Sequence, residues 1–380
     1  MMRIGLNLLH VRPEIGGCWN YIENVIAALK YIDCDCEFFA YCTSVSVKIL
    51  PKDPRLHAKI VNLDNSSQLA RISFEQCILP FLARRDKLDC MHWFANNIAV
   101  LGMVPSVVTV HDFIFIDMPT EVSFVKRLYL RAMVRFACQK ADVLAPISEA
   151  TAEAAVRLFG VNRKRISVIP NPLQDTFHPC LPEKVNEFRA RFKLPSKFWL
   201  YVANPAPYKN HAKLFVAYKK LRETTQVTWP LVLRANRIKE SEALDRKVVE
   251  LGIEQSVVWL PRLSSEDMAT LYSAATAMIF PSLYEGCGIP LLEAMACGCP
   301  VAASDISTTL EFAGDAVLKF DATNVDAIAY AMKQFVIDPA LRETCAAKGL
   351  IKVLEYSSRK IAVKLQAAYL DAASRRSAIT

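Results

Sequence analysis

Two glutamates, eight positions apart, flank a glycine-rich turn in the segment PSLYEGCGIPLLEAMACGCP at residues 281–300. The preceding run ATAMIFPS is apolar and predicts a buried strand, while the residues from Pro290 onward predict a helix that ends near Gly298. Ligands bind at the carboxyl ends of the strands in open parallel sheets. We therefore expect Glu285 and Glu293 to flank one small volume beside a strand end.

The turn between these carboxylates consists of Gly286, Cys287 and Gly288. Its glycines allow a close approach of main-chain N–H groups to a ligand. The start of the following helix has free N–H groups and a partial positive charge, which suit a phosphate. We expect Glu293 in the first turn of that helix, where a carboxylate also simply stabilises the helix dipole, and Glu285 alone could be a solvated loop residue.

The two carboxylates together indicate a particular kind of ligand. They repel a phosphate directly, but they accept hydrogen bonds from sugar hydroxyls. Two such acceptors beside a helix start therefore predict a ligand that carries both phosphate and polyol groups. A sugar nucleotide has this composition.

Predicted strands and helices, which must position this segment, alternate along the whole chain. Short apolar runs precede longer helical patterns, beginning with RIGLNLL and WNYIENVIAALKYI, which is typical of β-α-β units and parallel sheets. A proline-rich interruption at residues 170–197 divides the pattern, so the sequence predicts α/β domains at 1–180 and 181–357. The last stretch, 358–380, predicts a helix with no strand after it, and we expect it to return to the first domain.

The composition narrows the class of protein. The net charge of +8 is too small to indicate nucleic acid, and it suits a partner with phosphates or an anionic membrane surface. No apolar run reaches the roughly 18 residues of a transmembrane helix and no signal segment is visible, which predicts a cytoplasmic protein. We expect most of the twelve cysteines to be reduced, because they are scattered in a chain with no visible export signal. We expect no metal site, because the tight pairs at 34/36 and 297/299 lack further ligands at zinc spacing.

The 281–300 segment closely resembles the E-x7-E region of GT4-type retaining glycosyltransferases, the group 1 family. The resemblance covers almost the whole chain in the family's order. It implies the GT-B fold, in which two Rossmann-like domains with parallel sheets face each other across a cleft. The matching segments are GGCWNYIENVIAALK (16–30), HDFIFIDMP (111–119), ISEATAEAAVRLFGVNRKRISVIPNPL (147–173), LYVANPAPYKNHAKLFVAY (200–218) and residues 257–307.

The resemblance also implies a role for each matching residue. Glu285 would contact the hydroxyls of the donor sugar, and Glu293 would bind the ribose of the nucleotide. Lys209 would neutralise the diphosphate, and His111 would lie beside the donor sugar. The positions whose backbone would approach the sugar, the phosphates or the acceptor are Gly16, Gly17, Gly286, Cys287 and Gly288.

The implied reaction agrees with these residue types. Cleavage of a sugar–phosphate bond builds negative charge on the diphosphate, which cations and helix N–H groups stabilise without a metal cofactor. The resemblance implies attack on the front face of the sugar, with the leaving phosphate helping to deprotonate the acceptor. Double displacement would need a carboxylate nucleophile near the anomeric carbon, and the sequence has no clear candidate.

Several positions depart from the family pattern. Cys287 stands where a bulky phenylalanine is usual, and Ala203 replaces a glycine after its strand. The position of the usual second basic residue in ANPAPYKN is not basic, and Arg234 and Arg237 are candidate substitutes. STTLEF at 307–312 lacks the usual proline.

The segment KRLYLRAMVRFACQK at 126–140 has five basic residues and no acidic one. Arg127, Arg131 and Arg135 recur every four positions, so they share one helical face. Such a face is either solvated or lies against anionic lipid headgroups. The second alternative predicts peripheral contact with the inner face of the cell membrane.

These observations predict transfer of a hexose, with mannose from GDP-mannose as the first choice, to a saccharide or lipid-linked saccharide acceptor in surface polysaccharide biosynthesis. The alternatives are a nucleotide-sugar epimerase or hydrolase of the same fold, and a non-catalytic sugar-nucleotide-binding subunit. An NAD-dependent Rossmann enzyme is disfavoured because no GxGxxG follows the first strand.

Overall fold

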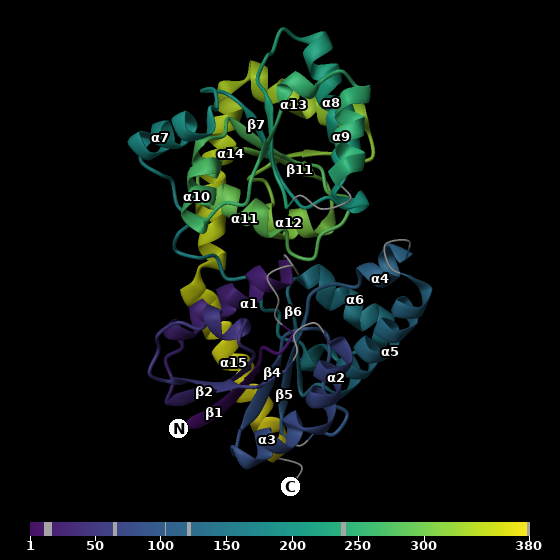
Figure 1. The fold of residues 1–380 in the computed structure, drawn as a ribbon, viewed down its shortest axis with the longest axis vertical. Coiled ribbons are helices and arrows are strands. Elements are labelled where there is room, and N and C mark those ends of the chain that lie inside the picture. Colours follow the sequence, from purple (N-terminus) through teal and green to yellow (C-terminus); the bar gives the residue numbers. More distant parts are fainter. Residues whose placement is uncertain (11–16, 64–66, 103, 120–122, 237–240, 378–380) are drawn as a thin grey trace. The chain divides into compact units, whose positions relative to one another are not determined.

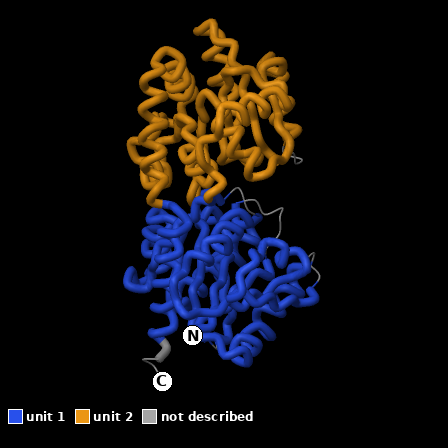
Figure 2. The backbone as a smooth tube through the Cα atoms, turned by 90° about the vertical axis from the view of Figure 1, so that its left-hand side faces the viewer, with its two compact units in different colours: residues 1–174, 356–380 blue, residues 175–355 orange. Residues whose placement is uncertain are grey.

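The structure is a computed structural model of the whole chain, and the residues that it describes are 1–10, 17–63, 67–102, 104–119, 123–236 and 241–377. The chain divides into two compact units, shown in Figure 2. Unit 1 comprises residues 1–174 and 356–380, and unit 2 comprises residues 175–355. Each unit contains its own parallel sheet of six strands.

The sheet of unit 1 has the strand order β3-β2-β1-β4-β5-β6, with every neighbouring pair parallel. Its central strands β4 and β5 are buried along their whole length because helices cover both faces of a parallel sheet. The strands are β1 (Met2–Asn7), β2 (Cys36–Cys42), β3 (Leu56–Ile60), β4 (Cys90–Trp93), β5 (Ser106–Val110) and β6 (Val143–Pro146).

The helices of unit 1 include the last helix of the chain, α15, which packs against α1, β4 and β5 (Figure 1). Its buried residues Ile361, Leu365 and Tyr369 recur every four positions and form the apolar stripe that holds it there. The helices are α1 (Gly17–Ala28), α2 (Gln68–Cys77), α3 (Leu79–Arg85), α4 (Ile114–Asp117), α5 (Phe124–Lys140), α6 (Glu149–Phe159) and α15 (Ser358–Ser377).

The sheet of unit 2 has the order β12-β11-β10-β7-β8-β9 and is also parallel throughout. Its strands are β7 (Trp199–Val202), β8 (Leu231–Arg234), β9 (Val257–Leu260), β10 (Ala277–Phe280), β11 (Val301–Ser304) and β12 (Leu318–Phe320). Its helices are α7 (Pro182–Phe192), α8 (His211–Thr224), α9 (Ser241–Glu250), α10 (Ser265–Ala274), α11 (Ile289–Ala296), α12 (Ser307–Ala313), α13 (Val325–Ile337) and α14 (Pro339–Lys352).

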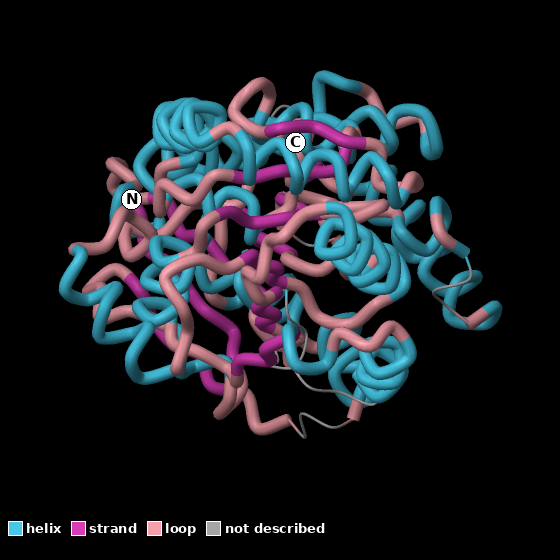
Figure 3. Tube along the Cα trace, turned by 90° about the horizontal axis from the view of Figure 1, so that it is seen from above, coloured by secondary structure: helices cyan, strands magenta, loops and turns pink. Residues whose placement is uncertain are grey.

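Helix boundaries in both units follow local capping signals. The side chains of Ser148, Ser264 and Asn324 accept hydrogen bonds from main-chain N–H groups at the starts of α6, α10 and α13. Gly160 ends α6 in the left-handed conformation. These signals set where each helix begins or ends along the chain. Figure 3 shows the strands flanked by helices.

Counted outward from its first strand, each sheet has the doubly wound order 3-2-1-4-5-6. The order reverses between β1 and β4 in unit 1, and between β7 and β10 in unit 2. Ligands of such sheets bind in the crevice beyond the strand ends at this reversal. The predicted α/β class with two parallel sheets is confirmed, and within the described ranges no helix has the length and apolar character needed to span a bilayer.

Candidate active site

The expected crevice of unit 2 lies at the loop after β7 and the loop after β10, which side-chain and main-chain hydrogen bonds join. Asn210 has a left-handed backbone (φ 62°), and its buried Nδ2 donates to the carbonyls of Pro281, at 3.1 Å, and Ala322, at 2.8 Å. The N–H of Leu283 donates to the carbonyl of Tyr208 at 2.8 Å. The residues between these contacts are therefore held in fixed positions.

Lys209 and Glu285 meet in this crevice. The Nζ of Lys209 lies 2.6 Å from Oε1 of Glu285, with the two side chains only 16% and 9% exposed. Thr308, from the start of α12, donates its hydroxyl to the main-chain carbonyl of Glu285 at 2.8 Å. Because both charges are largely removed from water, each depends on the other or on a ligand for compensation.

The turn after Glu285 leads into α11 through Gly288, whose φ of 69° lies in the left-handed region that favours glycine. The side chain of Cys287 is buried, with 4% exposed, so this residue presents its main chain rather than its thiol. Pro290 is the second residue of α11 and has no N–H to lose at a helix start. Gly286 lies in the bend between Glu285 and Cys287.

Glu293 lies deeper than the sequence predicted. The left-handed conformation of Gly288 lets α11 begin at Ile289, which makes Glu293 the fifth residue of the helix and leaves no acidic residue in the first turn. The expectation of a first-turn carboxylate is therefore wrong. Tyr272 of α10 donates its hydroxyl to Oε2 of Glu293 at 2.8 Å. Burial raises the pKa of Glu293 to about 7, against the opposing effects of Tyr272 and Arg234.

Arg234 ends β8, and its electrostatic neighbours are Tyr272, Arg262 and Glu293. Burial lowers the pKa of Arg234, and its buried Nε has no hydrogen-bond partner within the described part of the chain. The structure thus brings Arg234 to the Glu293 end of the crevice. Arg237 lies outside the described residues. The sequence did not indicate Tyr272, because nothing in the α10 pattern separates it from the apolar residues around it.

The crevice of unit 1 contains His111, directly after β5. Its Nε2 donates to the carbonyl of Phe94 at 2.7 Å, and its main-chain N–H donates to Oδ1 of Asn96 at 2.8 Å. Burial lowers the pKa of His111, but the Cys18 sulfur, through charge and a hydrogen bond, and the Phe94 carbonyl outweigh it and raise the pKa to about 9. His111 therefore carries a proton at neutral pH.

The glycine-rich segment before α1 is described only in part. Gly17 is the first residue of α1, and open space surrounds the position that a Cβ would occupy there. Gly16 lies outside the described residues.

A buried polar cluster in unit 1 was not predicted. Glu75 of α2 accepts hydrogen bonds from Nδ2 of Asn7 at 3.0 Å and of Asn97 at 3.2 Å, and Arg71 lies 2.9 Å from it. His10, seven per cent exposed, has no hydrogen-bond partner at either ring nitrogen among the residues that the structure describes. Burial, with Arg71 and His111, lowers its pKa to about 3, so it is neutral. The sequence signal that could have predicted this cluster is Glu75, an acidic residue on the apolar face of ARISFEQC.

The titratable residues give no metal-binding arrangement within the described part of the chain. No group of three or more His, Cys, Asp or Glu side chains there is placed to hold an ion. The candidate functional side chains of the two crevices are those of Lys209, Glu285, Glu293, Arg234 and His111.

Family models match both halves of the chain. Residues 183–350 match the model described as Glycosyl transferases group 1, and residues 15–177 match Glycosyltransferase Family 4. An O-antigen chain mannosyltransferase B of Escherichia coli is 29% identical over 277 residues, which are 72% of each chain. A serotype-specific mannosyltransferase WbdA of Escherichia coli is 26% identical over 236 residues, 61% of this chain and 29% of that longer protein.

Solved structures share the fold over nearly the whole chain. Anabaena Alr3699/HepE in complex with UDP-glucose has a TM-score of 0.78 at 18% identity, with 97% of this chain and 99% of that chain covered. Sucrose-phosphate synthase from Thermosynechococcus elongatus has a TM-score of 0.75 at 20% identity, with both chains fully covered. These similarities show the GT-B fold.

Proposed function

Because this chain belongs to the group 1 glycosyltransferases of the GT4 type, which have the GT-B fold, we propose that it transfers mannose from GDP-mannose with retention of configuration. The acceptor is a saccharide or lipid-linked saccharide of a bacterial surface polysaccharide. The relatives named as O-antigen chain and serotype-specific mannosyltransferases support both the sugar and the kind of acceptor. The ligand of the HepE structure supports a nucleoside diphosphate sugar as donor class.

The ion pair between Lys209 and Glu285 is the observation that carries this proposal. A diphosphate in the crevice would attract Lys209, and the freed carboxylate of Glu285 would accept hydrogen bonds from the sugar hydroxyls. Each charge then exchanges one partner for another, so neither is left buried and uncompensated. The start of α11 supplies main-chain N–H groups for the phosphates.

Glu293 and Arg234 complete the donor site in this proposal. Glu293 keeps Oε1 available for the ribose hydroxyls, since its bond with Tyr272 uses Oε2. Arg234 is the second cation, and it approaches the nucleotide from the Glu293 end. The Cys287 side chain takes no part, because it is buried.

The reaction follows from where charge develops. As the sugar–phosphate bond breaks, Lys209 and the α11 N–H groups stabilise the electron pair that leaves with the phosphate oxygen. The acceptor hydroxyl attacks the same face of the sugar, and its proton passes to that phosphate oxygen. His111, already protonated, can donate a hydrogen bond but cannot act as the base. With these cations in place, we expect transfer to need no added metal.

A screen of nucleotide sugars tests the proposal. Thermal unfolding is followed with GDP-mannose, UDP-glucose and ADP-glucose, and only the guanosine compound should raise the melting temperature. Transfer is then measured with and without saccharide acceptors. Donor consumption at an equal rate without acceptor would instead favour an epimerase or hydrolase, and binding without turnover a non-catalytic subunit.

We also propose peripheral contact with the inner face of the cell membrane through residues 126–140. This stretch forms most of α5, and its basic residues Lys126, Arg131, Arg135 and Lys140 are exposed. A lipid-linked acceptor would be reached from that surface.

A further inference from the structure

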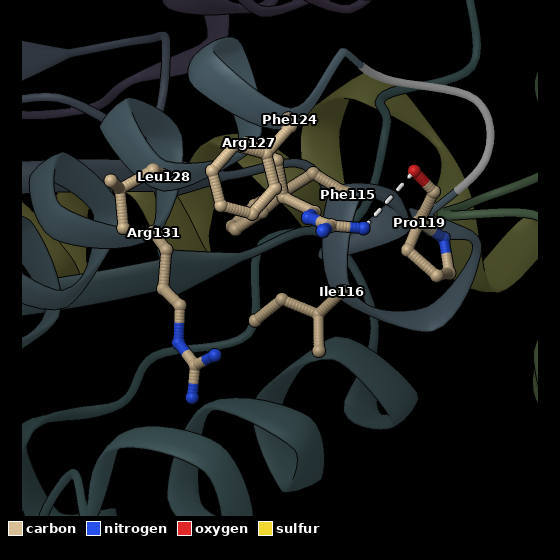
Figure 4. A pocket seen from close by; sticks show the side chains of 7 residues that line it. All are labelled: Phe115, Ile116, Pro119, Phe124, Arg127, Leu128 and Arg131. Carbon is tan, nitrogen blue, oxygen red and sulfur yellow. Dashed lines mark hydrogen bonds between the residues drawn. The ribbon is translucent and has the colours of Figure 1, made fainter.

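A pocket of about 300 Å³ lies between α4 and the start of α5 (Figure 4). Five of its lining residues are apolar and two, Arg127 and Arg131, are basic. Phe115 and Ile116 come from α4, whereas the arginines come from successive turns of α5. The pocket therefore combines an apolar lining with two positively charged side chains.

The apolar residues at the start of α5 are unusually exposed. Phe124, Val125 and Leu128 have 69%, 78% and 62% of their surface accessible. Phe124 and Leu128 also line the pocket, so its apolar wall continues onto the surface of the unit. Contiguous exposed apolar surface beside a pocket marks an interaction site more often than single exposed residues do.

The arginines of the pocket have no acidic partner among the described residues. Arg127 donates to the carbonyl of Pro119 at 3.4 Å and lies over the Phe124 ring, 5.4 Å from its centroid. Arg127 and Arg131 are four residues apart, a spacing at which like charges destabilise a helix. An anion bound beside both would remove this repulsion.

Helix α14 differs from α5 in this respect. Two of its basic residues lie in ion pairs, Lys348 with Asp315 at 2.6 Å and Lys352 with Glu355 at 2.8 Å. None of the five basic residues of α5 forms an ion pair with any residue that the structure describes. Basic side chains without acidic partners, next to exposed apolar ones, match a surface of anionic headgroups above acyl chains.

We propose that this pocket binds the phosphate of an anionic glycerophospholipid between Arg127 and Arg131, while Phe124, Val125 and Leu128 enter the acyl layer. The inference rests on the proposed membrane contact and assigns it to the first two turns of α5 with α4, rather than to all of residues 126–140. Arg135 and Lys140, which lie outside the pocket lining, contribute only general attraction.

Vesicle co-sedimentation of the full chain tests this assignment. The vesicles contain phosphatidylcholine either alone or mixed with phosphatidylglycerol. The wild type should sediment only with the anionic vesicles, and high salt should weaken its binding. Reversal of both pocket charges, R127E/R131E, should lower the vesicle affinity at least about tenfold.

The matched control is K184E/K333E, which reverses the charge of two exposed lysines of unit 2, on α7 and α13. It changes the net charge by the same amount, so it reports general electrostatic attraction. A second pair compares F124A/L128A with V249A/Y330A, whose side chains in unit 2 are equally exposed. Only R127E/R131E and F124A/L128A should lose most of their binding to anionic vesicles.

Equal losses within a pair would overturn the pocket assignment and leave a general membrane contact. Sedimentation that is independent of phosphatidylglycerol, or absent, would overturn the membrane contact as well. The shift in melting temperature with GDP-mannose is measured on every variant. If it persists while vesicle binding fails, the failure concerns the pocket and not the proposed transferase activity.

Discussion

The crevice between β7 and β10 in unit 2 and the crevice between β1 and β4 in unit 1 occupy equivalent places in two sheets of the same strand order. In unit 2 the loops after the two strands contribute Lys209 and Glu285, which form an ion pair. In unit 1 the loop after β1 contributes His10, whose neutral ring has no hydrogen-bond partner among the described residues, and the loop after β4 contributes Asn97 to the Glu75 cluster.

The difference shows that strand order sets where a ligand binds, and side chains set which ligand. The crevice of unit 2 contains an ion pair, and a charged ligand can separate its cation from its carboxylate. The crevice of unit 1 also has an ion pair, between Arg71 and Glu75 at 2.9 Å, but there the carboxylate already accepts hydrogen bonds from the amides of Asn7 and Asn97, so a charged ligand separates this pair less readily. The proposed donor and acceptor sides follow from this contrast.

The largest effect is expected when the charge pair of unit 2 is broken. Lys209→Ala and Glu285→Ala should each lower transfer by about a hundredfold to a thousandfold, because one group faces the developing charge and the other orients the sugar. Each also leaves a buried partner charge, which costs about 3 kcal/mol of folding stability. Initial rates and chemical denaturation measure the two effects separately.

Lys213→Ala is the matched control for the lysine. Lys213 is four residues further along the chain, near the start of α8, and its Nζ donates to the carbonyl of Thr323 at 2.7 Å. It should leave transfer unchanged. Full activity in Lys209→Ala or Glu285→Ala, with the protein folded, would refute the roles assigned to these residues.

Replacement of the protonated histidine of unit 1 should have the next largest effect. His111→Gln keeps a hydrogen-bond donor but loses the charge, and we expect kcat to fall by about tenfold to a hundredfold. The wild-type rate should fall as pH rises through about 9, because the protonated form is the active one, and the variant should lack this limb. If the rate of the variant falls over the same alkaline pH range as that of the wild type, the role of His111 is contradicted.

Local patterns explain which parts of the site could be predicted. The strand, the turn at Gly288 and the helix with Pro290 lie within twenty consecutive residues, so their signals could be recognised together. The hydrogen bond between Tyr272 and Glu293 joins residues 21 apart, and that between Asn7 and Glu75 joins residues 68 apart. These contacts depend on strand order, which periodicity does not determine.

Glu293 provides a third prediction, of intermediate size. Its pKa of about 7 exceeds the ordinary carboxyl value because of burial, and ribose hydroxyls donate best to the ionised form. Nucleotide affinity should therefore fall as pH decreases below about 7, approaching tenfold per unit. Isothermal titration at several pH values measures this dependence, and Glu293→Gln should abolish it.

Tyr272→Phe is the companion variant for Glu293. Loss of the hydroxyl removes a bond that favours the carboxylate, so the pKa of Glu293 should rise and the fall in affinity should begin at a higher pH. An unchanged pH profile would mean that Tyr272 only packs. The crevice of unit 1, whose histidines have pKa values far from 7, should contribute nothing in this range.

The smallest effect concerns His10, and it separates a ligand-binding residue from a structural one. His10 and His92 are both buried, and burial lowers the pKa of each to about 3. The ring of His92 bonds to Tyr369 at 2.9 Å and to Thr109 at 2.8 Å, whereas the ring of His10 has no hydrogen-bond partner in the described ranges. His92→Leu should therefore lower the free energy of unfolding by about 1–3 kcal/mol, since two partners lose their bonds.

His10→Leu should leave stability unchanged or raise it by about 1 kcal/mol, because an unpaired buried polar group is removed. If the ring serves acceptor hydroxyls, the variant should raise the KM for the acceptor severalfold and leave GDP-mannose binding as it was. Denaturation curves and acceptor titrations of both leucine variants check these outcomes. A destabilised His10→Leu with an unchanged acceptor KM would make His10 structural and would remove one of the groups that distinguish the crevice of unit 1.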